Sequence, residues 1–233
     1  ATAPYRGAGR PEATYVIERM MDEAALEIGV DPVELRRKNI IPAAAMPYKT
    51  ALTFTYDCGE FEKNMDDVLA LADTGGLAAR RREAEARGKI LGFGFANAIE
   101  PAAGPGVEYA EVRFNVSGTA TVLMGTKSQG QGHVTMYKQL MNERLGMDFA
   151  DIRILDGDTD KVGFGQGTAG SRSAVMGGSS LHLALDKIIE KTTKIAAHML
   201  EAAISDVVFE DGRFAIAGTD RSVAFMDVAK SAY

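Results

Sequence analysis

The chain has 233 residues, enough for one large domain or two small ones with a packed core. Its hydrophobic fraction of 46% and charged fraction of 25% are those of an ordinary globular protein, and it contains no run of apolar residues long enough to span a membrane. We therefore expect no membrane span. The net charge of −6 argues against a face that neutralises phosphates, so we expect no nucleic-acid partner either.

The first ninety residues predict a mostly helical segment. Pro11 suits a first helical turn, apolar residues then recur at helical spacing up to Ile28, and Gly29 is placed to end the helix. Asp31 is placed to cap a second short helix. The elements expected after it are an extended piece over 52–57 and helices over 60–72 and up to Arg87.

The single cysteine, Cys58, lies just after that extended piece and excludes an internal disulfide and a cysteine-based metal cluster. No histidine is near it in the sequence, which favours a small turn residue over a nucleophile. The three histidines, His133, His182 and His198, show no paired ligand spacing. We therefore expect no metal ion held by side chains of this chain.

From residue 91 onward, strand-like and helix-like stretches alternate. The predicted strands cover 92–100, 108–116, 119–126 and 151–158, the predicted helices cover 134–145 and 173–203, and a hairpin over 207–218 precedes a last short helix from Ala224. This order predicts an α+β fold with a mixed or mainly antiparallel sheet and flanking helices. We therefore divide the chain into a helical N-terminal segment, residues 1–90, and an α+β lobe, residues 91–233.

Two glycine-rich loops each lie between a predicted strand and the helix that follows it. They read TKSQGQGH at 126–133 and GQGTAGSRS at 165–173. Glycine lets the backbone approach a ligand closely, and helix N-termini offer unpaired N–H groups at the positive end of the helix dipole. Two such termini on one lobe predict a cradle for a phosphate or diphosphate.

Gly165, Gly167 and Gly170 also match the GxGxxG pattern of dinucleotide-binding folds. That pattern requires a tight strand–turn–helix unit, with an acidic residue at the end of the next strand. Here the predicted strand ends near Leu155 and a long loop follows, whereas Glu190, at the acidic position, lies within a predicted helix. An NAD-binding Rossmann fold is therefore the less favoured alternative.

The loops and their order resemble the molybdenum-binding large subunit of the xanthine dehydrogenase and aldehyde oxidase family, including its carbon monoxide dehydrogenase-like members. The resemblance rests on YRGAGRPEATYVIERMMDEAALEIGVDPVELRRKN, GTKSQGQGHVTMYKQLMNERLGM and LDGDTDKVGFGQGTAGSRSAVMGGSS, at 5–39, 125–147 and 155–180. It implies that the protein binds a molybdopterin dinucleotide, usually the cytosine form in bacteria. It also implies hydroxylation of carbon centres with water as the oxygen source.

The resemblance assigns two sets of cofactor-binding residues. The loop that wraps the pterin and diphosphate is matched by Gln129, Gly130, Gln131, Gly132 and His133. The second cofactor loop is matched by Thr168, Gly170, Ser171, Arg172 and Ser173. Glutamine amides suit pterin edges, and a guanidinium suits phosphate, so the chemistry of these side chains agrees with the assignment.

A third match, at Tyr5 to Arg10, is to the active-site loop that approaches the metal. The resemblance implies that Arg6, Gly7 and Ala8 form the catalytic part of this loop. Carbon monoxide dehydrogenases carry a copper-holding cysteine in it, and Gly7 takes that position here. We therefore expect an aldehyde or an N-heterocycle as the substrate, and not carbon monoxide.

Several parts of the family's machinery have no counterpart in this sequence. The glutamate that serves as catalytic base is absent, and so are the flavin modules. The iron–sulfur modules are absent too, because their clusters are held by several cysteines and this chain has one. We expect a middle fragment of a large subunit that is inactive alone. The rest of that subunit, with iron–sulfur and FAD-carrying partners, would complete a cytoplasmic enzyme. A non-catalytic nucleotide- or cofactor-binding module is the alternative.

Overall fold

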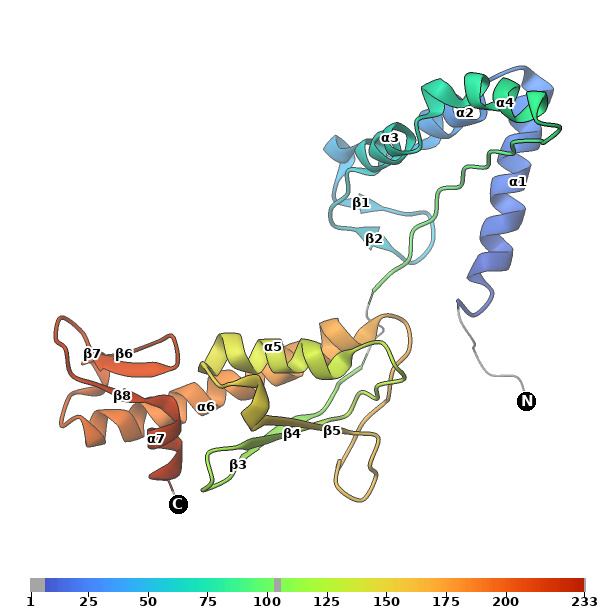
Figure 1. Ribbon diagram of the computed structural model, residues 1–233. Coiled ribbons are helices and arrows are strands. Elements are labelled where there is room, and N and C mark those ends of the chain that lie inside the picture. Colours follow the sequence, from blue (N-terminus) through green and yellow to red (C-terminus); the bar gives the residue numbers. More distant parts are fainter. Residues whose placement is uncertain (1–6, 103–105, 233) are drawn as a thin grey trace. The chain divides into compact units, whose positions relative to one another are not determined.

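The computed structural model describes residues 7–102 and 106–232, which divide after Glu100 into two compact parts (Figure 1). The N-terminal part contains α1 (Arg10–Ile28), α2 (Pro32–Asn39), β1 (Tyr48–Lys49), β2 (Thr55–Tyr56), α3 (Phe61–Leu71) and α4 (Leu77–Ala86). The C-terminal part contains β3 (Ala110–Phe114), β4 (Ala120–Met124), α5 (His133–Leu145), β5 (Ile152–Asp156), α6 (Gly178–Met199), β6 (Val207–Glu210), β7 (Arg213–Ile216), β8 (Ser222–Ala224) and α7 (Phe225–Lys230).

The predicted ends of the first two helices are confirmed. Pro11 lies in the first turn of α1, and Gly29 ends the helix with a left-handed φ of 69°. At the start of α2 the Asp31 carboxylate accepts hydrogen bonds from the backbone N–H groups of Val33 at 2.8 Å and Glu34 at 3.1 Å. These local rules set the helix boundaries because each cap satisfies backbone groups that the helix itself leaves unpaired.

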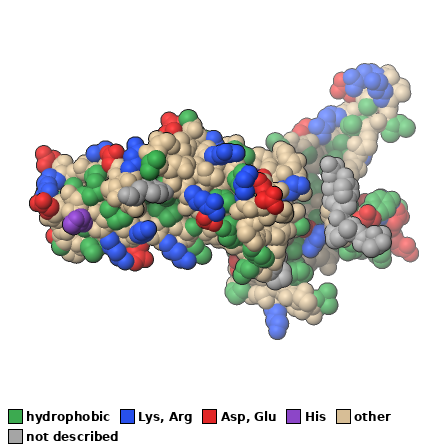
Figure 2. Space-filling model, turned by 90° about the horizontal axis from the view of Figure 1, so that it is seen from below, with side chains coloured by type: hydrophobic (Ala, Val, Ile, Leu, Met, Phe, Trp, Pro, Cys, Tyr) green, Lys and Arg blue, Asp and Glu red, His purple; other side chains and the backbone are tan. Residues whose placement is uncertain are grey.

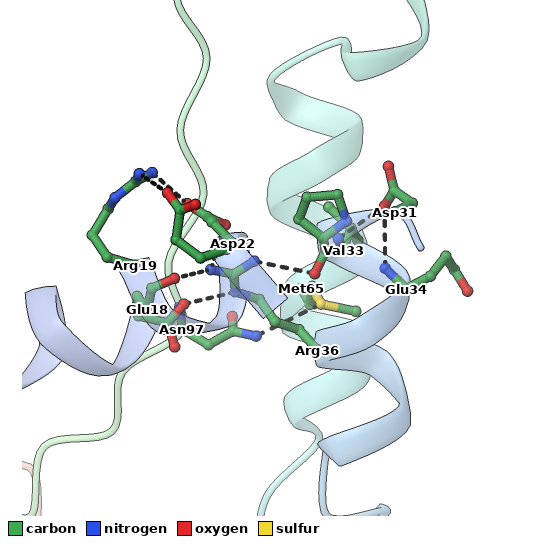
Figure 3. A network of polar contacts seen from close by, with 11 residues as sticks. Glu18, Arg19, Asp22, Asp31, Val33, Glu34, Arg36, Met65 and Asn97 are labelled. Carbon is green, nitrogen blue, oxygen red and sulfur yellow. Dashed lines mark hydrogen bonds and ion pairs between the residues drawn. The ribbon is translucent and has the colours of Figure 1, made fainter. Parts of the chain in front are cut away.

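A buried arginine joins α2 to α1 (Figure 3). Arg36 is 3% exposed; its Nε donates to the Glu18 carboxylate at 2.7 Å and its Nη2 to the Asp22 carboxylate at 2.9 Å. The guanidinium also lies over the Phe95 ring, 5.8 Å from the ring centroid. Because a buried charge is costly unless its donors are paired, these contacts fix the two helices together.

The segment 92–100 was predicted as a strand, and that prediction is wrong. The segment is irregular and lies against α1, where side chains provide its hydrogen-bonding partners. The Asn97 backbone N–H donates to the Glu18 carboxylate at 3.0 Å, and Arg10 pairs with Glu100 at 2.8 Å. The alternation of glycine and phenylalanine imitates a strand, but the segment pairs with helix side chains and not with another strand.

Cys58 is an exposed free thiol next to Asp57. A hydrogen bond to the Asp57 carboxylate, together with its negative charge, raises the pKa of the Cys58 thiol. Because the thiolate is the nucleophile, we expect alkylation by iodoacetamide to begin at a higher pH than in Asp57→Asn. Mass spectrometry of the alkylated chain across neutral to alkaline pH measures this. Asp67→Asn is the control for the change of charge, and identical profiles for Asp57→Asn and the wild type would contradict the expectation.

The C-terminal part has the predicted α+β fold with a mixed sheet. β4 pairs with β3 in an antiparallel hairpin and with β5 in parallel, so β4, α5 and β5 form a crossover unit. Both α5 and α6 cover the same face of this sheet (Figure 1). The core between them is formed by buried side chains that include Val122, Met124, Tyr137, Met141, Leu181 and Leu185.

The long helix predicted over 173–203 starts as a π-helical turn, Ser173–Gly177, and continues as α6 to Met199. The predicted hairpin around Asp211 and Gly212 is confirmed, and β8, which was not predicted, makes it a three-stranded antiparallel sheet. The chain therefore does not return from α6 to a strand parallel to β5. This topology excludes the Rossmann alternative.

No helix within residues 7–102 and 106–232 combines the length and apolar character needed to cross a membrane. On the face shown in Figure 2, Lys and Arg side chains are interspersed with Asp and Glu side chains. That face therefore carries no electrostatic field of a single sign.

Candidate functional site

The two glycine-rich loops lie side by side in the C-terminal part. The first loop, residues 125–132, follows β4, and the second loop, residues 157–172, follows β5. Since β4 and β5 are adjacent parallel strands, both loops leave the same edge of the sheet. The Gly167 backbone N–H donates to the Gly125 carbonyl oxygen at 3.1 Å, which joins the two loops directly.

Two glycines allow this close approach. A Cβ added to Gly165 would lie 2.6 Å from the Gly125 Cα, and one added to Gly125 would lie 2.8 Å from the Phe164 carbonyl oxygen. In the first loop, Gly130 and Gly132 have left-handed φ angles of 104° and 85°. The sequence therefore needs glycine for space where the loops touch and for backbone freedom where the first loop turns.

His133 begins α5 and is 95% buried, since only 5% of it is exposed. Its Nδ1 has no hydrogen-bond partner within the described residues, and the N-cap residue Gly132 provides no side-chain cap for the helix. The first N–H groups of a helix have no partner inside the helix and form its positive end. An unpaired buried ring nitrogen at this position suits an anionic ligand.

The two glutamines of the first loop are on its surface. Gln131 Oε1 accepts from the Gln129 backbone N–H at 2.6 Å, which closes the turn between them. Ser128 anchors the start of this turn, because its N–H donates to the Asp156 carboxylate at the end of β5 at 2.7 Å. Both glutamine side chains are exposed. Their side chains are therefore open to solvent on the outside of the loop.

The five predicted residues around the second loop divide into an exposed pair and an inward-facing set. Gly170 and Ser171 are exposed, with left-handed φ angles of 55° and 57°. The Thr168 hydroxyl donates to the Lys127 carbonyl oxygen at 2.7 Å and is 2.9 Å from the hydroxyl of the buried Ser173. Thr168 therefore joins the second loop to the first.

Arg172 is also buried, with 5% of it exposed. Its guanidinium pairs with the Glu108 carboxylate and donates to the carbonyl oxygens of Gly167 and Val107, each at 3.2 Å. An arginine that binds phosphate needs its donors at the surface. In this structure Nη1 and Nη2 donate to oxygen atoms of the protein instead.

Behind the loops lies a buried hydroxyl network that sequence reasoning missed. The hydroxyls of Thr126 and Tyr137 are 2.6 Å apart, and the Tyr137 hydroxyl donates to the Ser173 carbonyl oxygen at 3.2 Å. Burial raises the pKa of Tyr137, so the hydroxyl stays protonated and can donate. A Cβ added to Gly177 would lie 2.5 Å from the Tyr137 hydroxyl oxygen of α5. The start of the long helix is therefore packed tightly against α5.

The predicted catalytic loop belongs to the N-terminal part. Arg6 lies outside the described residues, whereas Gly7, Ala8 and Gly9 form a turn before α1 with φ angles of 84°, 50° and 91°. A left-handed conformation at alanine costs about 1 kcal/mol or more, so this turn is held by its surroundings. The ion pair between Arg10, the residue after the turn, and Glu100 is one contact that stabilises it.

Comparison with known proteins shows matches to the molybdopterin cofactor-binding domain over residues 68–233 and, for a second such domain, over residues 1–40. The carbon monoxide dehydrogenase large chain of Hydrogenophaga pseudoflava is 38% identical, over 95% of this chain and 30% of that protein. The nicotine 6-hydroxylase large subunit of Paenarthrobacter nicotinovorans is 32% identical, over 98% of this chain and 29% of that protein.

Solved structures give the same result. The crystal structure of quinoline 2-oxidoreductase from Pseudomonas putida 86 superimposes with a TM-score of 0.85 at 31% identity, over 98% of this chain and 31% of that one. The chain thus spans less than a third of the length of these relatives.

Proposed function

Because the chain belongs to the molybdopterin cofactor-binding domain family, we propose that its two loops bind a molybdopterin dinucleotide within a larger molybdenum-dependent oxidoreductase. The predicted resemblance to the large subunits of the xanthine dehydrogenase and aldehyde oxidase family is confirmed by these relatives. The proposal also covers the reaction of the assembled enzyme and the subunits that complete it.

The observation that carries the proposal is the start of α5. His133 places a buried, unpaired Nδ1 at an uncapped helix N-terminus. In this proposal Nδ1 carries the ring proton, and an anionic oxygen of a diphosphate would accept from it and from the backbone N–H groups, where the helix dipole favours negative charge. The residues present therefore fit the anionic portion of the cofactor.

The remaining exposed groups suit the polar edges of the same ligand. The carboxamides of Gln129 and Gln131 would pair with the pterin, and the backbone and hydroxyl at Gly170 and Ser171 would contact the nucleotide. We propose the cytosine form of the dinucleotide on the basis of the family resemblance. In this assignment three inward-facing residues hold the two loops together; they are Thr168 and Arg172 of the second loop and Ser173, which directly follows it.

When bound, the cofactor supplies the redox chemistry by which a carbon centre is hydroxylated with water as the oxygen source. This chain binds and orients the cofactor, and the turn at Gly7 and Ala8, with Arg6 before it, would shape the substrate pocket. We propose an aldehyde or N-heterocycle as the substrate, because Gly7 replaces the copper-holding cysteine. We also propose that the rest of a large subunit and iron–sulfur and FAD-carrying subunits complete the enzyme.

The first test uses the native complex that contains this chain. Molybdenum content and the nucleotide released by acid are measured on the complex captured through a tag on the chain. We expect stoichiometric molybdenum together with cytidine monophosphate. A complex that contains neither would overturn the proposal, and a nucleotide without molybdenum would favour a non-catalytic nucleotide-binding module.

A second test examines the role assigned to His133. We expect His133→Leu to weaken binding of cytidine diphosphate to the chain on the order of ten-fold or more, because a hydrogen bond to a charged group contributes about 1.5–3 kcal/mol. Isothermal titration calorimetry measures the Kd. His182→Leu is the matched control, since that histidine is half-exposed on α6. Equal affinity of the two variants would show that His133 does not contact the anion.

A further inference from the structure

The carboxylate of Glu108 lies beneath both glycine-rich loops. Glu108 precedes β3, and its side chain is fully buried, with 0% exposed. One carboxylate oxygen is so close to Gly125 of the first loop that a Cβ there would collide with it. The other oxygen pairs with Arg172, the last residue of the second loop. One buried charge therefore contacts both loops from below.

Arg172 extends this contact to the backbone. It donates to the Gly167 carbonyl oxygen inside its own loop and to the Val107 carbonyl oxygen before β3. The Ser180 hydroxyl of α6 also donates to the Glu108 carbonyl oxygen at 3.0 Å. The residues just before β3 therefore hold the second loop through Arg172 and are themselves bonded to α6 through Ser180.

We infer that the buried Glu108–Arg172 ion pair is a positioning device that sets the two loops against each other before any ligand binds. Arg172 then acts through its neighbours and does not bind phosphate itself. It fixes the conformation of Gly170 and Ser171, the exposed residues just before it. This inference rests on the proposed function in one respect only, which is the identity of the ligand that binds to the loops.

The test is hydrogen–deuterium exchange on the ligand-free chain carrying Glu108→Gln, a change that keeps the shape of the side chain and removes its charge. We expect backbone amides of both loops to exchange on the order of ten-fold faster than in the wild type, while β4 and α6 keep their protection. Glu190→Gln is the matched control, because Glu190 on α6 is exposed and pairs with Lys194. Unchanged loop protection in a folded Glu108→Gln chain would overturn the inference.

A second variant covers the case in which Glu108→Gln does not fold. The double variant Glu108→Gln with Arg172→Gln removes both charges and leaves no unpaired buried ion. We expect a folded chain whose loops exchange fast. Loops as protected as in the wild type would overturn the inference, and so would a loss of protection that includes β4 and α6, because the pair would then serve the whole fold.

Ligand binding is measured separately, by titration of the same chains with cytidine diphosphate. Failure of the wild-type chain to bind would count against the proposed function and leave the exchange result intact. Conversely, if the wild type binds while loop exchange is insensitive to Glu108→Gln, the positioning role is refuted and the proposed function stands.

Discussion

Gly165→Ala should destabilise the C-terminal part by about 1–3 kcal/mol and abolish ligand binding at the loops, because it forces apart two backbones that touch. The added Cβ would lie 2.6 Å from the Gly125 Cα and 2.7 Å from its carbonyl carbon. Backbone atoms cannot move aside as a flexible side chain does, so the loops must separate. Urea unfolding measures the loss of stability, and titration with cytidine diphosphate measures the loss of binding.

Gly163→Ala is the matched control in the same loop. A Cβ at Gly163 meets nothing within 4 Å, and its φ is not left-handed. We expect a change within about 0.5 kcal/mol, or a small gain in stability from the reduced entropy of the unfolded chain. Equal destabilisation by the two substitutions would show that contact between the loops is not the cause.

Arg36→Met should destabilise the N-terminal part by about 3 kcal/mol, because it leaves carboxylates without their buried partner. Glu18 is 13% exposed, and its carboxylate accepts hydrogen bonds from Arg36 Nε and from the Asn97 backbone N–H. Exchange of backbone amides, resolved by segment, measures the effect. We expect lost protection in α1 and α2 and unchanged protection in α5 and α6.

The neighbouring residue provides the control for that experiment. Arg37 pairs with Glu34, Glu62 and Asp66, but it is 28% exposed, and these carboxylates are each more than half exposed. Exposed ion pairs contribute about 1 kcal/mol or less, so Arg37→Met should have a small effect. If the two variants lose equal stability, burial does not explain the importance of Arg36.

Short-range features of the fold were predictable because their causes are short-range. Gly29 and Asp31 occupy the helix ends at which their backbone or side-chain properties are required. The turn at Asp211 and Gly212 follows from the preference of such pairs for left-handed backbone. The same reasoning fails for residues 92–100, where a strand-like pattern pairs with side chains of α1 instead of a second strand.

The sequence by itself determined the end of α1, the start of α2, the hairpins, the mixed α+β class and the two loops that carry the family resemblance. Only the tertiary structure decided that β4 and β5 are parallel neighbours, which brings the loops to one edge of the sheet. It also decided that Arg172 faces inward to Glu108, 64 positions earlier in the chain. Such partners leave no local signature, because their contact depends on how the strands pair and not on spacing along the chain.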